Sequence, residues 1–417
     1  MHSTAGPIAL KARYVFPVDS APLHGGVITI LGERIVAVGE NTSGREPQGL
    51  GNVAILPGLV NAHTHLEFSD LPSPLGQPGM GFAQWVRTVV EHRRQAGGGD
   101  QAAGAHRQLA VRDGLSEVRR SGTTLLGEIA TPGWPDQPFR EGPVDCVVFL
   151  ELLGLSLGRT DALMEMARRH VQFGKTPGGG WLAGISPHAP YTTHPELIAR
   201  AAELSTKERV PIAMHVAESP DELELLRCGS GALLELLIDL EAWDPTSIPP
   251  GTRAIDYLRL LSKSHRALVI HGNYLDEEAI DLLGRHADHM SVVFCPRTHA
   301  YFQHADYPLS KLIAAGVNVA LGTDSRASNP DLRLLEDIRS VARRYANVPP
   351  ERVLRLGTIG GAEALGQGHE VGSLRAGKRA DLTIVRLPDA DASDPHELVL
   401  GYDLPVELTY YRGRPTM

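Results

Sequence analysis

Histidines recur at the ends of short apolar runs in this sequence. The first pair, His63 and His65, closes the run in Pro57 to Phe68 (PGLVNAHTHLEF). In an extended strand, residues two apart point to the same face, so both imidazoles would be directed at one point. Imidazole is a common ligand of zinc and related divalent metals, so the pair makes half of a metal site. A single His-x-His pair is more often an ordinary polar alternation on a strand.

Three later stretches favour a metal site over an ordinary polar alternation, because each is a short apolar run that ends at a residue able to bind a metal ion. The stretches are Ala213 to Ser219 (AMHVAES), Leu268 to Asn273 (LVIHGN) and Val319 to Ser325 (VALGTDS). They add His215, His271 and Asp324 to the first pair.

Apolar strand-like runs alternate with amphipathic stretches of helical length between residues 57 and 365, which predicts a parallel sheet covered by helices. After the run that carries His63, further runs are Thr123 to Ile129, Val147 to Leu153, Trp181 to Ser186, Ile212 to Val216, Ala267 to His271, Ser291 to Cys295 and Val317 to Gly322. Eight strands are the number of a (β/α)8 TIM barrel, an α/β fold. Residues 229–255 are longer than an ordinary connection, and such insertions often cover a site.

The two ends of the chain have a different character from the middle. Residues 1–56 contain short β segments, namely Ile8 to Val15, Gly26 to Leu31, Arg34 to Val38 and Val53 to Leu56. Residues 366–417 contain similar segments, including Ala380 to Val385 and Val406 to Gly413. We therefore expect a small β-sandwich domain built from both termini, with the barrel spanning residues 57–365 between its two parts.

Composition limits the possible partners. The 417 residues carry a net charge of -9 with both signs interspersed, which argues against a nucleic-acid partner. No stretch approaches the roughly 18 apolar residues of a membrane span, and the N-terminal region lacks the pattern of a signal peptide. The cysteines Cys146, Cys228 and Cys295 form no paired framework. We expect a cytoplasmic protein that acts on a small molecule without membrane contact.

The barrel would bring the candidate residues together. In a (β/α)8 barrel, catalytic residues lie at the C-terminal ends of the strands and converge although they are distant in sequence. His63, His65, His215, His271 and Asp324 all occupy that position. Three or four nitrogen and oxygen ligands with an open position make a catalytic metal site, in which bound water reaches a pKa of about 7. This arrangement predicts hydrolytic chemistry.

These motifs, in this order, resemble the amidohydrolase superfamily. The matching pieces are Pro57 to His65, Met214 to Glu218, His271-Gly272 and Gly322 to Ser325, and Gly372 to Leu382 resembles the return to the β-sandwich. The sequence is most similar to the branch of single-metal deaminases. Binuclear relatives usually carry a carboxylated lysine at the end of the fourth strand, and Trp181 to His188 contains none. The resemblance therefore implies one divalent metal ion, with zinc favoured and iron or manganese also compatible.

Roles for individual residues follow from the resemblance. It implies that His63, His65, His215 and Asp324 bind the metal. It also implies catalytic roles for Glu218 as the proton shuttle, for His271 as a hydrogen-bonding group and for Asp324 in moving a second proton. Proton transfer of this kind suits the release of ammonia from a heterocycle.

The sequence signals for substrate contacts are weaker than those for the metal ligands. His188, in Ser186 to Thr192, matches a substrate-contacting motif of adenosine-type deaminases. Glu67 could bind ribose hydroxyls or could be a surface carboxylate. Trp85 and Arg87 are further candidates. Arg297 could reach the substrate, and an ion pair at the rim is the competing explanation. His299 lies at the end of the same strand as Arg297 and could also reach the substrate. His194 and His304 could lie near the barrel mouth and receive no assigned role.

The resemblance implies a deaminase of an aminated heterocycle. The adenine ring of a nucleoside is favoured, of the aminodeoxyfutalosine, adenosylhomocysteine, methylthioadenosine or 5′-deoxyadenosine type, while guanine and triazine substrates stay open. A chlorohydrolase or a cyclic amide hydrolase would keep the site and change the leaving group. A non-catalytic barrel scaffold would require missing ligands, and none is missing. Relatives are commonly dimers or larger, so a homo-oligomer is expected.

Overall fold

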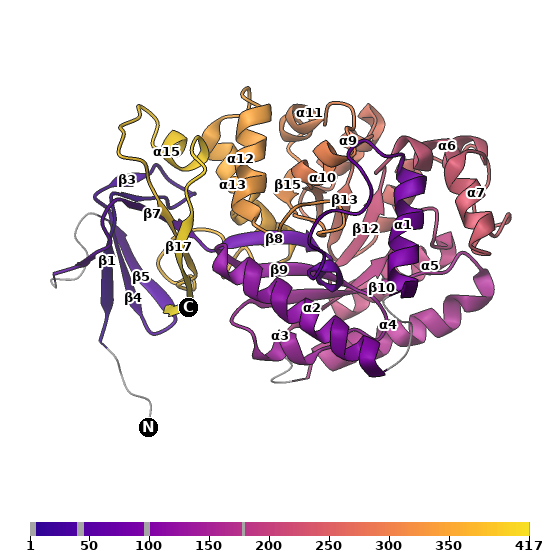
Figure 1. Cartoon of the computed structure of the whole chain (residues 1–417), viewed down its shortest axis with the longest axis horizontal. Coiled ribbons are helices and arrows are strands. Elements are labelled where there is room, and N and C mark those ends of the chain that lie inside the picture. The colour runs from indigo at the N-terminus through magenta and orange to yellow at the C-terminus, as the bar shows by residue number, and fades with distance from the viewer. Residues whose placement is uncertain (1–5, 40–45, 96–100, 177–179, 417) are drawn as a thin grey trace.

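The computed structural model describes residues 6–39, 46–95, 101–176 and 180–416, and a parallel barrel forms its centre (Figure 1). Its strands are β8 (Leu59–Thr64), β9 (Thr123–Ala130), β10 (Asp145–Leu152), β11 (Leu182–Pro187), β12 (Ile212–Val216), β13 (Ala267–His271), β14 (Met290–Phe294) and β15 (Asn318–Leu321). A parallel bridge between Thr64 and Asp324 joins the first strand to the last. The predicted (β/α)8 TIM barrel is confirmed.

The barrel strands are buried on both faces, as expected for strands between a filled interior and a layer of helices. All residues of β8 and β9 are buried. On β10, Val147 and Phe149 belong to the cluster inside the barrel, whereas Val148 and Leu150 pack with the outer helices. This two-sided burial explains why the strands appear in the sequence as continuous apolar runs.

Helices surround the barrel (Figure 1). They are α1 (Phe82–Gln95), α2 (Gln101–Arg120), α3 (Gln137–Glu141), α4 (Thr160–Gly174), α5 (Pro195–Glu208), α6 (Pro220–Cys228), α7 (Ala232–Asp239), α8 (Ala254–Leu261), α9 (Glu277–Arg285), α10 (Pro296–Tyr301), α11 (Leu309–Ala314), α12 (Leu334–Arg344), α13 (Pro350–Leu356) and α14 (Ile359–Ala364), with short 3-10 turns at η1 (Leu66–Phe68) and η2 (Leu157–Arg159). The long segment 229–255 contains α7 and the start of α8, and α7 packs against α1.

Strands from both termini form two further sheets beside the barrel (Figure 1). The first has the order β5 (Arg34–Gly39), β4 (Val27–Leu31), β1 (Ile8–Lys11) and β6 (Gln48–Gly49). The second has the order β18 (Arg414–Thr416), β17 (Val406–Tyr411), β16 (Leu382–Arg386), β7 (Val53–Pro57), β2 (Tyr14–Val15) and β3 (Leu23–His24). Buried side chains from both sheets, among them Ile28 and Ile384, share one core. The expected β-sandwich domain is confirmed, while its boundaries at residues 56 and 366 stay a prediction.

The segment Ile8 to Val15, predicted as one β segment, is divided in the structure. β1 pairs with β4 in the first sheet, and β2 pairs with β7 in the second. Between them, the backbone N–H of Ala12 donates to the carbonyl of Gly26 at 3.2 Å. The chain crosses from one sheet to the other here, so a single continuous ladder is not possible.

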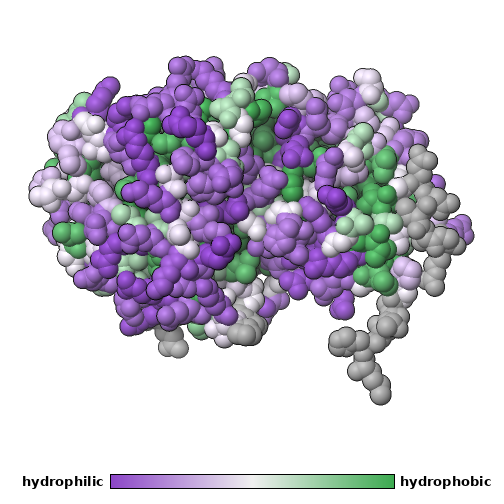
Figure 2. Space-filling view, turned by 180° about the vertical axis from the view of Figure 1, so that it is seen from behind, coloured by the Kyte–Doolittle hydropathy of each residue, from purple (hydrophilic) through white to green (hydrophobic). Residues whose placement is uncertain are grey.

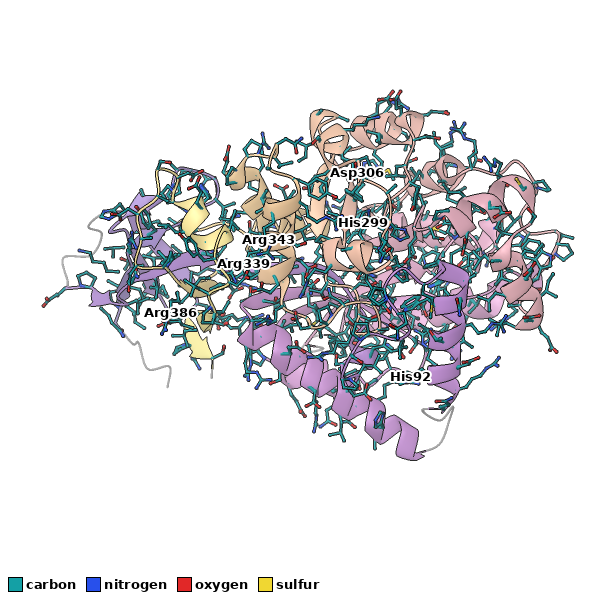
Figure 3. The ribbon with its side chains drawn as sticks, turned by 45° about the horizontal axis from the view of Figure 1, so that its top comes forward. His92, His299, Asp306, Arg339, Arg343 and Arg386 are labelled. Atoms are coloured by element: carbon teal, nitrogen blue, oxygen red, sulfur yellow. The ribbon has the colours of Figure 1, made fainter. Side chains whose placement is uncertain are left out.

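A buried arginine joins the barrel to the C-terminal segment. Arg339 on α12 donates from Nε to the carbonyl of Val399 in α15 (His396–Leu400) at 3.1 Å, and its Nη1 lies 2.8 Å from Glu336 Oε1. Arg343, one turn further along α12, forms an exposed ion pair with Asp403 at 2.9 Å. Figure 3 shows Arg339 and Arg343 where α12 approaches this segment. These contacts fix the segment between the β-sandwich strands β16 and β17 against α12.

The surface is mostly hydrophilic. Figure 2 shows charged and polar residues over most of the rear face, with hydrophobic residues in small patches between them. Within the described ranges, no helix has both the length and the apolar character needed to cross a lipid bilayer.

Candidate active site

Three histidines meet at the C-terminal ends of the strands. His63 is on β8, His65 follows it directly, and His215 is on β12. One ring nitrogen from each lies within 4.8 Å of the other two, and all three side chains are buried. The ring centroids of His63 and His65 are 4.9 Å apart, and those of His63 and His215 are 5.0 Å apart. The barrel therefore brings residues that are distant in sequence into one cluster.

Asp324 completes this cluster from the end of β15. Its Oδ1 lies 3.5 Å from His63 Nε2 and 3.7 Å from His65 Nε2. The hydroxyl of Ser328 donates to Oδ2 at 2.9 Å, which orients the carboxylate. Burial acts to raise the pKa of Asp324, but the imidazole of His63 and the other histidines outweigh it and hold the pKa below its ordinary value. The carboxylate is thus kept ionised beside the histidines.

The donor set fits a divalent metal ion. Among the described residues, both ring nitrogens of His63 and Nδ1 of His65 have no hydrogen-bond partner although they are buried. His215 Nδ1 lies 2.9 Å from the carbonyl of His188, which leaves Nε2 free to bind a metal. Burial, followed by the charge of His63, lowers the pKa of His65 and of His215 and favours neutral imidazoles. Three imidazoles and one carboxylate are ligands that zinc, iron and manganese accept.

Left-handed backbone occurs at the ends of the strands that carry these residues. Ala217, His271 and Asp324 have φ values of 55°, 65° and 56°, which non-glycine residues rarely adopt. Such strain persists only where the surroundings impose it, and it is common at active sites. Here it turns the chain sharply after β12, β13 and β15, so that the side chains face the barrel mouth.

Glu218 and His271 lie beside the three histidines. Glu218 Oε1 is 3.3 Å from His271 Nε2, and both side chains are buried. Burial, followed by the charges of Asp324 and Glu222, raises the pKa of Glu218 well above its ordinary value. The carboxylate of Glu222 accepts the backbone N–H groups of Ala217 and Glu218, each at 2.8 Å, and fixes the turn that carries Glu218.

Two buried polar residues that we did not predict hold the strand ends in place. Glu128 accepts from the hydroxyl of Thr64 at 2.7 Å and from the N–H of Leu66 at 3.0 and 3.1 Å. Asn61 donates to Thr323 Oγ1 at 2.8 Å and thereby ties β8 to the residue before Asp324. Neither has a sequence signal beyond being a polar residue within an apolar strand.

The cluster opens into a cavity of about 270 Å³. His65, His215, Glu218, His271 and Asp324 line it on the barrel side. The opposite wall is apolar and comes from η1, α1 and the segment 229–255; it comprises Phe68, Phe82, Val86, Val89, Val90, Leu233, Leu236, Leu237, Leu240 and Ala242. The segment 229–255 therefore covers the site, and α1, which was not predicted as a helix, supplies part of the same wall.

Two of the predicted substrate contacts lie in this cavity. His188 and Trp85 both line it. His188 Nδ1 is 2.7 Å from the hydroxyl of Thr192, which leaves Nε2 toward the cavity, and Trp85 donates from its indole to the carbonyl of Ala327 at 3.2 Å. These contacts orient both rings.

The structure does not bring the other candidates to the cavity. Arg297 is half-buried with its guanidinium on Asp331 and Asp337, each at 2.8 Å, so the competing explanation of an ion pair fits it. Arg87 pairs with Asp239 at 2.6 Å on the surface. Glu67 is absent from the described cavity lining and instead pairs with Arg93 at 2.5 Å.

The other three candidate histidines have structural partners or lie outside the cavity lining. They are His194, His299 and His304. His194 caps α5, where its Nδ1 accepts from the N–H of Glu196 at 3.1 Å. His304 Nδ1 lies 3.0 Å from the hydroxyl of Tyr274. His299 is buried and meets the rings of Phe294 and Tyr307 edge-on, and these two rings stack on each other at 3.7 Å.

Arg93 and Glu151 line the cavity although the sequence analysis passed over both. Arg93 is on α1 and Glu151 is on β10. The signal for Glu151 is an acidic residue near the end of an otherwise apolar barrel strand, where a barrel places its functional residues.

Comparisons with known proteins agree with this geometry. A methylthioadenosine/adenosylhomocysteine deaminase of Pelotomaculum thermopropionicum is 30% identical over 92% of this chain and 84% of its own length. An aminodeoxyfutalosine deaminase of Deinococcus radiodurans is 27% identical over 84% of this chain and 83% of its own. The solved structure of Helicobacter pylori aminofutalosine deaminase with methylthio-coformycin has a TM-score of 0.83 at 23% identity and covers 98% of this chain and 100% of that one.

Residues 54–414 match the amidohydrolase family, and this range includes the whole barrel, all five strand-end residues of the cluster and the strands that return to the β-sandwich. The protein belongs to the amidohydrolase family.

Proposed function

We propose that the protein is a metal-dependent hydrolase that removes the amino group from the adenine ring of a nucleoside and releases ammonia. The observation that carries this proposal is the position of Glu218 and His271, 3.3 Å apart, beside three buried histidines and Asp324 in one cavity. The site thus combines metal ligands with a buried acid that can exchange protons with a ring nitrogen. The names of the similar deaminases support the same reaction.

His63, His65, His215 and Asp324 would hold a single divalent metal ion, and zinc suits three imidazoles and one carboxylate best. A metal ion bound there would supply a water molecule acidic enough to act as a nucleophile at neutral pH. β11 contributes no lysine, which supports one ion rather than two.

The protein side chains would move the protons. Glu218 would protonate the ring nitrogen next to the amine-bearing carbon, because burial raises the pKa of this carboxyl and so favours its protonated form. His271 would hydrogen-bond the oxygen that forms at that carbon, and Asp324 would pass a proton toward the leaving ammonia. Tyr307 supports His271 by donating to its backbone carbonyl at 2.9 Å.

The apolar wall narrows the choice of nucleoside. Leu233, Leu236, Leu237 and Leu240 stand opposite the polar cluster. An apolar 5′ substituent could be buried against them, and each fully buried aliphatic side chain contributes about 1.5–3 kcal/mol. This favours nucleosides with a methylthio or aryl group at the 5′ position over adenosine itself.

The homo-oligomeric state and a cytoplasmic location remain proposals.

A panel of substrates tests this proposal. Ammonia release should be measured with methylthioadenosine, 5′-deoxyadenosine, adenosylhomocysteine, aminodeoxyfutalosine and adenosine. Chloride release should be measured with a chlorotriazine, and ring opening with a cyclic amide. We expect the corresponding hypoxanthine nucleoside from the 5′-modified adenine nucleosides. Turnover of the chlorotriazine or the cyclic amide alone would instead support the alternative leaving group.

A further inference from the structure

Glu151 is a buried acidic group in the cavity for which the reaction above has no use. It lies on β10 next to the last residue of the strand, is 1% exposed and lines the same cavity as Glu218. Within the described part of the chain, neither carboxylate oxygen has a hydrogen-bond partner. Leaving a buried carboxylate without donors is costly, so a bound molecule is expected to provide them.

The charged and polar neighbours of Glu151 that the structure describes lie close to its carboxylate but donate no hydrogen bond to either oxygen. Arg93 lines the cavity beside it, but Arg93 Nη2 is held by Glu67 Oε1 at 2.5 Å. His188 Nε2 lies 3.8 Å from Glu151 Oε1, which is beyond hydrogen-bond distance. One arginine thus balances two carboxylates, and this balance favours a neutral group with hydrogen-bond donors over an anion.

His188 also locates Glu151 relative to the metal cluster. The ring centroids of His188 and His215 are 5.0 Å apart, and His188 Nε2 lies 3.8 Å from Glu151 Oε1. An adenine ring whose amine-bearing carbon faces the histidines has its glycosidic bond on the far side of the purine. The sugar would then extend in the direction of Glu151.

We propose that Glu151 binds the cis-diol of the ribose, with one hydroxyl donating to each carboxylate oxygen. The two oxygens of a carboxylate can accept two parallel hydrogen bonds, and vicinal hydroxyls provide two donors at matching separation. Arg93, held in place by Glu67, is a positioning residue whose positive charge favours the ionised form of Glu151. This inference rests on the proposed nucleoside deaminase activity and adds the requirement for a ribose.

The proposal reassigns a role that the sequence suggested for Glu67. The oxygens of Glu67 face Arg93 and, at 3.5 Å, the hydroxyl of Thr131, and the side chain is not part of the described cavity lining. Glu67 therefore acts on the substrate only through Arg93.

The test compares ribose with deoxyribose in the metal-loaded full-length protein. Ammonia release is measured with methylthioadenosine and its 2′-deoxy and 3′-deoxy analogues, for the wild type and for Glu151→Gln. In the wild type we expect kcat/KM to fall roughly 10- to 100-fold when either hydroxyl is removed, because a hydrogen bond to a charged group is lost. In Glu151→Gln the ratio of kcat/KM between ribose and deoxyribose substrates should approach one.

Glu165→Gln serves as the control, since Glu165 is an exposed carboxylate on α4 paired with Arg169 at 3.0 Å. This variant should keep the wild-type ratio. If Glu151→Gln fails to fold, the comparison of the three substrates in the wild type still tests whether both ribose hydroxyls are required. Equal kcat/KM for all three in the wild type, or an unchanged ratio in folded Glu151→Gln, would overturn the ribose assignment and leave deamination standing. Absence of ammonia from every nucleoside would overturn both.

Discussion

Asp324 contacts His63 twice. Its backbone N–H donates to the carbonyl of His63 at 3.0 Å, and its Oδ1 lies 3.5 Å from His63 Nε2. His63 is on the first strand of the barrel and Asp324 follows the last, so the contacts that close the barrel also assemble the metal cluster. A hydrogen bond of 2.8 Å from the Asn61 amide to the Thr323 hydroxyl stabilises the same junction. Folding and metal binding are therefore coupled at this point.

This coupling predicts the effect of a side chain at Gly322. A Cβ there would lie 2.7 Å from His63 Cβ and 3.0 Å from the His63 carbonyl oxygen, closer than real contacts allow. Gly322→Ala should therefore displace His63 and weaken metal binding roughly 10- to 100-fold, as disturbed support of a ligand typically does. Metal content after dialysis against a competing chelator checks this. Gly81→Ala, where a Cβ meets nothing within 4 Å, is the matched control. Equal metal retention in both variants would contradict the coupling.

Glu218 should be required for turnover without being required for the metal. Glu218→Gln keeps the shape of the side chain and removes the proton that it exchanges. We expect full metal content with a loss of roughly 100- to 10,000-fold in kcat, the usual contribution of general acid–base catalysis. Glu224→Gln, at an exposed position on the helix α6 that follows Glu218, should retain wild-type activity. A Glu218→Gln enzyme as active as this control would show that another group carries the proton.

Much of this site could be predicted because its residues end apolar runs. His63, His65, His215, His271 and Asp324 each terminate a strand of the barrel, and the geometry of parallel strands brings strand ends together regardless of their distance in sequence. The same regularity allowed the barrel and the terminal β-sandwich to be predicted from periodicity.

The cavity walls could not be predicted in this way. Arg93 enters the cavity through the packing of α1 against the barrel mouth, a tertiary contact that no local pattern encodes. Glu151 does lie near the end of an apolar barrel strand, but its partners come from other elements. Glu67 and Arg297 illustrate the reverse case. Both lie close in sequence to candidate motifs, but ion pairs with Arg93 and Asp337 direct their charges away from the cavity.

The apolar wall should control selectivity for the 5′ substituent. Leu240 lines the cavity and is only partly buried, so Leu240→Ala should leave the fold intact. We expect KM for methylthioadenosine to rise roughly tenfold, since apolar contact area is lost, with little change for adenosine. Ile238→Ala, at a position that is 54% exposed on the same helix, provides the control. A uniform change for both substrates would indicate that the wall does not contact the 5′ group.

Discrimination between ribose and deoxyribose should depend on pH. Burial raises the pKa of Glu151 to about 7, the positive charge of Arg93 opposes this rise, and the charge of Glu67 adds to it; His188 is the other titratable group that approaches Glu151. Because the ionised carboxylate accepts two hydrogen bonds, the preference for ribose should be complete above pH 7 and should decline as the pH falls below it. The ratio of kcat/KM for methylthioadenosine to that for its 2′-deoxy analogue, measured from pH 5.5 to 8.5, reports this directly, because titrations that affect the chemistry cancel in the ratio. A ratio that is constant with pH would contradict the role of Glu151.

The central claim is that metal ligands and Glu218 together deaminate an adenine nucleoside. The most direct measurement follows ammonia and hypoxanthine nucleoside formed from methylthioadenosine by protein that has been stripped of metal and then titrated with zinc. We predict that stripped protein is inactive, that activity rises linearly with added zinc and reaches a plateau at one ion per chain, and that ammonia and hypoxanthine nucleoside appear in equal amounts. Deamination by the stripped protein at the same rate, or zinc-loaded protein that converts none of the adenine nucleosides, would contradict the claim.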